Sequence, residues 1–228
     1  MKTGNGEGEP AVRMLIYVIR HGETELNKSG VIQGATDEPL NQSGRDIAAV
    51  TGRNMRGIRF DACISSPLSR ARETAEIVLR ESGNSGVEIR MDDRIREINC
   101  GDIEGKKLME ASMPPEEAEL FFRDPFCFPG FPNGENIRQV VGRTQDFLRE
   151  LAARDDGKTY LVSTHGCALR AMLNFLYDDP EDYWQGHAPY NCAVSIIESE
   201  DGKLKLLEAD RLFYDASLAV DRYKLSNS

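Results

Sequence analysis

Two of the three histidines in the chain, His21 and His165, occupy similar settings. Each follows a predicted buried strand, 14–19 or 159–163, after one intervening residue, and 14–19 is a continuous apolar run of the kind expected for a strand covered on both faces. Each is also followed by a glycine, which lets a ligand approach the backbone closely. A single histidine is more often a core or surface residue. Two at equivalent strand ends favour a shared site, because ligands of open α/β sheets bind beyond the carboxyl ends of the strands.

Arginines supply the positive charge that such a site would need to bind an anion. Arg20 directly follows an apolar run, where a charge requires a partner, and Arg70 lies one turn into a predicted helix. The guanidinium group is a planar, permanently charged fork that fits two phosphate oxygens at once. A surface salt bridge is the alternative for Arg20. Arg72 competes with Arg70, but two positions along a helix it is expected to point elsewhere.

The elements that must position these residues alternate between strands and helices. Buried strands are predicted at 14–19, 61–65, 87–91 and 159–163. Apolar residues at helical spacing predict helices near 44–55, 66–79, 134–154 and 167–176. Ser66 is expected to cap the second helix, with Pro67 at its first position. The dipeptide Asp201-Gly202 indicates a terminal hairpin. We therefore predict an α/β fold with a mainly parallel central sheet and an antiparallel edge.

Residues 106–133 differ in character, because prolines and aromatic residues cluster there. We predict a helical insertion followed by an irregular loop, together forming a cap over the site. The aromatic side chains of this cap would either present an apolar wall to the substrate or pack the cap onto the core: Phe121, Phe122, Phe126, Phe128 and Phe131. Residues 1–13 are predicted to be a flexible N-terminal tail, and residues 14–228 a single domain that includes the cap.

Composition and charge limit the partners. The formal net charge of −10 argues against nucleic acid or an anionic membrane, since both require a positive face. No apolar run reaches the ~18 residues of a membrane span, and the N-terminus lacks the apolar segment of a secretory signal. The five cysteines are scattered without a Cys-x-x-Cys pair, which predicts reduced thiols instead of disulfides or a zinc site. We therefore expect a cytoplasmic protein.

The stretch Arg20–Thr24, Arg-His-Gly-Glu-Thr, together with Asn27, resembles the signature of the histidine phosphatase superfamily, which includes the cofactor-dependent phosphoglycerate mutases. The similarity extends from Leu15 to Glu198, too far for a chance match. Further blocks follow in the family's order: Gln33-Gly34, Pro39–Asn41 with Gly44, Ser65–Ala71 with Thr74-Ala75, Arg96-Glu97 with Gly101–Gly105, Gly134-Glu135 and Ser163–Gly166. The resemblance implies a three-layer α/β/α sandwich with a helical cap insertion.

The resemblance also implies chemical roles. His21 would attack phosphorus and form a phosphohistidine, which splits one displacement into two. Arg20, Arg70 and a protonated His165 would hold the phosphoryl oxygens, and Glu97 would be the general acid and base. The implied substrate-binding residues are Asn27, Arg20, Arg70, His165, Gly166, Gln33 and Gly34. The implied partner is a small phosphorylated metabolite, and a homodimer stays open. No metal and no cofactor is required.

For two residues, a role outside the chemistry is an open alternative. Glu97 would form an ion pair with Arg94 or Arg96 if it were not the general acid. His187, the third histidine, is interpreted as a surface residue, with contact to the substrate as the less favoured hypothesis.

Three activities fit these residues. A phosphatase passes the phosphoryl group from His21 to water, a mutase passes it to an organic hydroxyl, and a non-catalytic module binds a phosphorylated ligand. The last is disfavoured because every catalytic residue type is present. Glycerate mutases that resemble this chain carry a long, basic insertion after the general acid. Residues 106–133 are short, and their basic residues are just Lys106, Lys107 and Arg123. We therefore predict a phosphatase, with mutase activity as the alternative.

Overall fold

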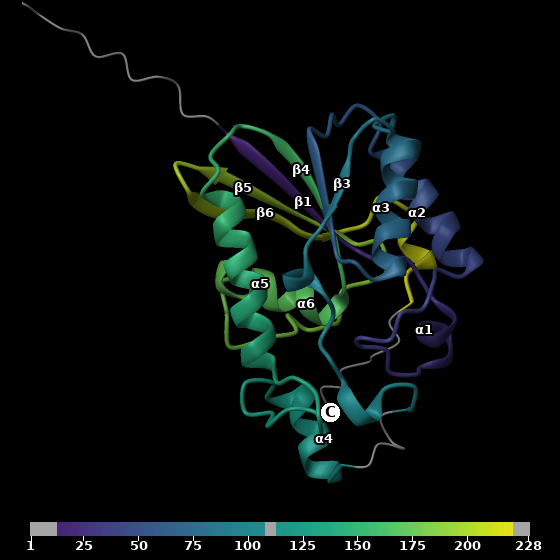
Figure 1. Ribbon diagram of the computed structural model, residues 1–228, viewed down its shortest axis with the longest axis vertical. Coiled ribbons are helices and arrows are strands. Elements are labelled where there is room, and N and C mark those ends of the chain that lie inside the picture. The colour runs from purple at the N-terminus through teal and green to yellow at the C-terminus, as the bar shows by residue number, and fades with distance from the viewer. Residues whose placement is uncertain (1–12, 108–112, 221–228) are drawn as a thin grey trace, which may run out of the picture.

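Six strands form one sheet in the order β3-β2-β4-β1-β5-β6 (Figure 1). The computed structural model describes residues 13–107 and 113–220. The parallel strands are β1 (Met14–Arg20), β2 (Ala62–Ser65), β3 (Ile89–Met91) and β4 (Thr159–Thr164). The antiparallel edge consists of β5 (Val194–Glu200) and β6 (Lys203–Arg211). The predicted mixed sheet is confirmed. The predicted tail lies outside the described residues except for Arg13, so the division into a tail and one domain stays a prediction.

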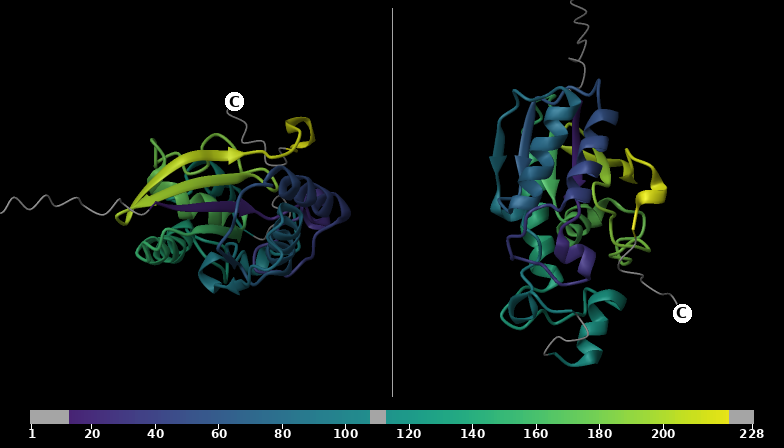
Figure 2. Two further views of the ribbon diagram at one scale, coloured as in Figure 1. Left: turned by 90° about the horizontal axis from the view of Figure 1, so that it is seen from above. Right: turned by 90° about the vertical axis from the view of Figure 1, so that its right-hand side faces the viewer.

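Helices cover both faces of this sheet (Figure 2). One apolar cluster joins α2 (Gln42–Asn54) and α3 (Ser69–Ser82) to one face of the strands. A second cluster joins α5 (Ile137–Ala152) and α6 (Gly166–Leu173) to the other face. The predicted three-layer sandwich is therefore confirmed. None of the helices in the described ranges has the length and apolarity that crossing a membrane requires.

Among the α-helices in the described residues, α1 (Glu25–Ser29), α2 and α5 begin with a side-chain cap, whereas α3, α4 (Pro115–Arg123) and α6 do not. The Asn41 side chain accepts the N–H of Gly44 at 2.8 Å, and Asn136 begins α5 in a capping box. The prediction that Ser66 caps the next helix is wrong. That helix, α3, begins at Ser69 without a side-chain cap. Ser66 is instead turned toward the site. Within residues 13–107 and 113–220, short 3₁₀ helices lie at Asp93–Ile95, Gly101–Ile103, Asn174–Leu176 and Ala216–Leu218.

The cap contains α4 (Pro115–Arg123) and lies beyond the carboxyl ends of the parallel strands, near the short α1 (Glu25–Ser29) (Figure 1). Residues 108–112 of the predicted insertion lie outside the described part of the chain. The Phe121 ring centroid lies 5.1 to 5.5 Å from those of Phe128, Phe131 and Trp184. Phe128 and Phe131 are buried. These contacts support the interpretation that the aromatic residues pack the cap onto the core.

Candidate active site

Both strand-end histidines lie where β1 and β4 end. Arg20 pairs in register with Thr164, and the backbone N–H of His21 donates to the Thr164 carbonyl at 2.9 Å. The centroids of the His21 and His165 rings are 5.1 Å apart. The structure therefore brings the two histidines together, and both are buried.

The glycines beside these histidines also have a packing role that the sequence did not show. A Cβ atom on Gly22 would lie 2.6 Å from the backbone oxygen of Gly44 in α2. A Cβ atom on Gly166 would lie 3.3 Å from Nε of Arg20. The small residues thus let α2 and the Arg20 side chain pack against the two strand ends.

The His21 ring is oriented by its own backbone neighbourhood. Its Nδ1 lies 2.7 Å from the carbonyl oxygen of Gly22. A carbonyl can only accept a hydrogen bond, so Nδ1 carries the proton and Nε2 keeps its lone pair. Burial lowers the pKa of His21 well below its usual value, and the charges of Arg70 and Arg20 lower it further. His21 is therefore a neutral imidazole with a nucleophilic nitrogen available.

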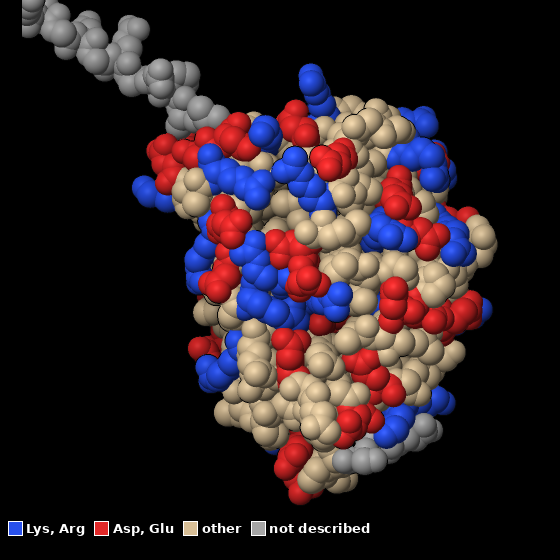
Figure 3. Space-filling view, viewed as in Figure 1, with Lys and Arg blue, Asp and Glu red and all other residues tan. Residues whose placement is uncertain are grey.

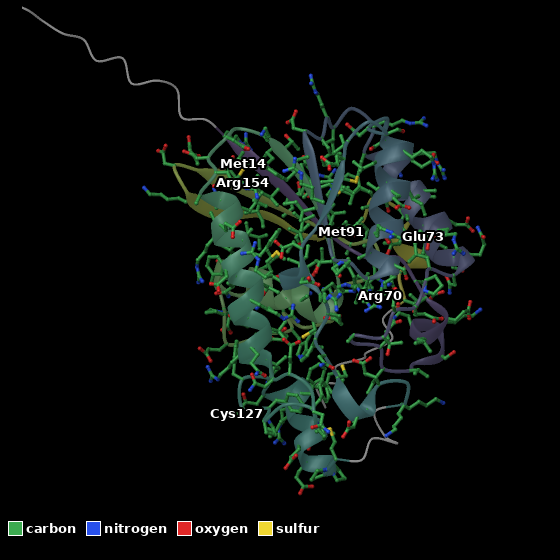
Figure 4. The ribbon with its side chains drawn as sticks, viewed as in Figure 1. Met14, Arg70, Glu73, Met91, Cys127 and Arg154 are labelled. Atoms are coloured by element: carbon green, nitrogen blue, oxygen red, sulfur yellow. The ribbon has the colours of Figure 1, made fainter. Side chains whose placement is uncertain are left out.

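Arg70 is fully buried near the end of α3 that faces the cap (Figure 4). Its Nε donates to Nδ1 of His165 at 3.2 Å, and its terminal nitrogens donate to the carbonyls of Thr36 and Gly34 at 2.7 and 2.9 Å. The Glu104 carboxylate holds this loop by accepting the backbone N–H of Thr36 at 2.7 Å. The loop thus fixes the guanidinium through neutral acceptors.

His165 differs from the protonated form that we expected. Because Arg70 donates to Nδ1, that nitrogen carries no proton, and Nε2 lies 2.8 Å from the Ser66 hydroxyl. Burial lowers the pKa of His165 well below its usual value, as do the charges of Arg70, His21 and Arg20. In this arrangement His165 is neutral.

Arg20 is held by the segment that precedes β5. One of its terminal nitrogens donates to the carbonyl of Pro189. The Asn191 amide from the same segment donates to the backbone oxygen of His21 at 3.0 Å and to the Asn27 side chain at 3.4 Å. The predicted site residue Asn27, buried in α1, is thereby joined to the strand end that carries His21.

Two of the predicted site residues each have a buried donor without a hydrogen-bond partner in the described part of the protein. These donors are Nε of Arg20 and the side-chain nitrogen of Gln33. Gln33 is anchored by its oxygen, which accepts from the Thr24 hydroxyl at 3.0 Å. An unpaired buried donor is costly, so a bound anion that accepts from either group would remove that cost.

Glu97 lies against the first turn of α6. Its carboxylate accepts the backbone N–H groups of Cys167 and Ala168 at 3.2 and 3.0 Å. It therefore occupies a helix N-terminus, where negative charge is favoured, one turn from His165. The alternative ion pair is not formed: Arg94 pairs with Asp92 and Glu150, and Arg96 pairs with Asp93.

Some residues at the site were missed by sequence reasoning. Thr74 accepts the backbone N–H of Gly22 at 2.9 Å, and Ser66 and Asn191 contact His165 and His21 as described above. Ser66 and Thr74 lie within the matched block Ser65–Ala71 with Thr74-Ala75, which did not by itself assign them a role, and Asn191 belongs to none of the matched blocks. His187 stacks on Tyr190, with its Nε2 3.7 Å from a carboxylate oxygen of Asp210.

In the ranges that the structure describes, no group of three or more His, Cys, Asp and Glu side chains is placed to hold a metal ion.

Comparison with known proteins agrees with this geometry. The sequence model of the histidine phosphatase superfamily (branch 1) matches residues 16–210. This chain belongs to that superfamily.

Some relatives of this chain are named as phosphatases and others as phosphoglycerate mutases. The chain is 33% identical to the "Uncharacterized phosphatase PhoE" of Bacillus subtilis, over 84% of this chain and 91% of that protein. It is 29% identical to the "Probable phosphoglycerate mutase GpmB" of Erwinia tasmaniensis, over 81% of this chain and 85% of that protein. The solved structure of Bacillus stearothermophilus YhfR superposes with a TM-score of 0.80 at 33% identity, covering 88% of this chain and 98% of that one.

Acid is expected to destabilise the fold through His21 and His165. Their pKa values are lowered in the folded state, so below the usual value of 6.5 the unfolded chain binds protons that the folded chain does not. The free energy of unfolding should therefore fall as the pH drops below 6.5, by up to about 1.4 kcal/mol per pH unit for each histidine. Urea unfolding at pH 7.5 and pH 5.5 measures this loss. The variant His165→Asn should lose less stability than the wild type over the same interval, and equal losses would contradict the prediction.

Proposed function

We propose that the protein is a metal-independent phosphatase that hydrolyses phosphomonoesters through a phosphohistidine on His21. The observation that carries this proposal is a neutral, buried His21 whose Nε2 keeps its lone pair beside Arg20 and Arg70. A neutral nucleophile among fixed positive charges suits attack on an anionic phosphoryl group.

The reaction has two steps. Nε2 of His21 forms a bond to phosphorus while the bond from phosphorus to the ester oxygen breaks, and Glu97 gives a proton to the leaving oxygen. Water then attacks the phosphohistidine, Glu97 takes the proton of that water, and inorganic phosphate leaves with His21 restored. The position of Glu97 against α6, one turn from His165, supports this assignment.

The phosphoryl oxygens would be held by Arg20, Arg70 and His165. A phosphate dianion between these groups would oppose the burial and the nearby positive charges that lower the pKa of His165, so His165 would take up a proton when substrate binds. The unpartnered nitrogens of Arg20 and Gln33 would supply further hydrogen bonds. Asn27, Gly34 and Gly166 would line the same position.

Water as the acceptor is supported by the cap. In its described residues, 106–107 and 113–133, Lys106 donates to the carbonyl of Asp102 and Arg123 pairs with Glu119. Figure 3 shows more acidic than basic surface at this end of the face in view. No basic cluster is therefore seen there that would grip a second acidic group, such as the carboxylate of a phosphoglycerate. Small phosphorylated metabolites are the substrate class that we propose.

The variant His21→Ala is expected to lower phosphatase activity by at least about 1,000-fold, because it removes the nucleophile. The assay is phosphate release from 4-nitrophenyl phosphate with EDTA present. His187→Ala is the matched control, since it removes the histidine outside the site, and it should keep near wild-type activity. Trapping acid-labile phosphate on the wild type would show the covalent step. Equal activity of wild type and His21→Ala would overturn the proposal.

The mutase alternative makes a different prediction. If water is the acceptor, 3-phosphoglycerate supplied with a catalytic amount of 2,3-bisphosphoglycerate should give little 2-phosphoglycerate, because the phosphohistidine is hydrolysed before it can be transferred. The two products can be separated by ³¹P NMR. Isomerisation that is faster than hydrolysis would identify the protein as a mutase.

A further inference from the structure

Arg143 on α5 uses its whole hydrogen-bonding capacity on Glu135 and on the segment that carries Glu97. Nε and one terminal nitrogen donate to the two oxygens of Glu135 at 2.8 and 2.9 Å. The remaining donors reach the backbone oxygens of Arg94, Arg96 and Glu97 at 2.8, 2.7 and 3.0 Å. A guanidinium has five N–H groups, and all five are used here.

Glu135 also binds the backbone of Asn99, on the other side of Glu97 in the sequence. Its carboxylate accepts the backbone N–H of Asn99 at 2.9 Å, and its own backbone N–H donates to the Asn99 carbonyl at 2.8 Å. Residues 97–99 belong to neither a helix nor a strand, so they lack the regular backbone partners of those elements. The Arg143–Glu135 pair replaces such partners on both sides of Glu97.

The Glu97 side chain is held independently by α6. Its carboxylate position therefore depends on two supports, the helix N-terminus at one end and the Arg143–Glu135 pair at the other. Proton transfer to a leaving group is sensitive to such placement, because an error of about 1 Å can cost on the order of 100-fold in rate.

We propose that Arg143, together with Glu135, is a positioning residue for proton transfer by Glu97. The inference rests on the phosphatase function proposed above. Lysine cannot replace Arg143, because an ammonium has three donors at one point and cannot span Glu135 and three carbonyls. Arg143→Lys should thus loosen Glu97 while retaining the positive charge.

The test compares two substrates of similar size, 4-nitrophenyl phosphate and phenyl phosphate. Nitrophenolate leaves readily without a proton, whereas phenolate is a much stronger base and needs one. Arg143→Lys is expected to lower kcat/KM for phenyl phosphate about 10-fold more than for 4-nitrophenyl phosphate. Glu97→Gln should show the same pattern, more strongly. Arg149→Lys is the matched control on α5, because Arg149 contacts Gln145 and Asp146 instead, and it should change neither value.

The double variant separates positioning from general stability. If Arg143 acts through Glu97, adding Arg143→Lys to Glu97→Gln should cost no further kcat/KM on either substrate. Equal losses on both substrates, or a further loss in the double variant, would overturn the inference. If Arg143→Lys fails to fold by thermal melting, Glu135→Gln tests the same pair, because an amide NH₂ would face a donor.

Failure of the proposed function would look different. The wild type would then show no His21-dependent hydrolysis of either substrate, and the inference would fall with it. A wild type that is active through His21, with Arg143→Lys equally impaired on both substrates, would overturn the positioning role alone.

Discussion

The parallel pairing of β1 with β4 is the constraint on which the rest of the site depends. Because Arg20 lies opposite Thr164, the chain leaves the sheet at His21 and His165 side by side. The pairing of β2 with β4 adds the next strand end in the same way, since the backbone N–H of Ser66 donates to Ser163. A shift of one residue in either register would turn these side chains to opposite faces and separate them.

Within the described residues, the positive charges of Arg20 and Arg70 are held in place without being neutralised by a hydrogen-bonded carboxylate. The described hydrogen bonds of Arg20 and Arg70 end on backbone carbonyls and on His165, which are neutral acceptors. Arg170, also buried, pairs instead with the carboxylate of Asp210 at 2.5 Å, which cancels its charge. Uncompensated positive charge in the interior is costly, and burial lowers the pKa of Arg70 while the Glu97 carboxylate opposes that shift. An anion bound beside Arg20 and Arg70 would provide the missing compensation.

The sequence was sufficient to predict the elements and the strand-end residues, because those follow from local apolar patterns. It was insufficient where a residue's role depends on contacts far along the chain. Ser66 has the sequence pattern of a helix cap, yet its hydroxyl lies beside His165, 99 positions away. The neutral state of His165 depends on its burial and on Arg70, neither of which a local pattern shows. Asn191 has no motif of its own and contacts His21 only because β5 pairs with β1.

The cap and the neighbours of Glu97, the proposed general acid and base, pack into one apolar cluster. Phe128 and Phe131 of the cap belong to the same apolar cluster as Ile98, the residue after Glu97. That cluster also contains Cys167 and Ala168, whose backbone N–H groups donate to the Glu97 carboxylate. Close packing transmits small displacements. A shift of the cap relative to the core would therefore also displace the Glu97 carboxylate. If Glu97 has the proposed role, the aromatic residues of the cap would influence catalysis without touching the substrate. They would do so through the position of the group that handles the proton.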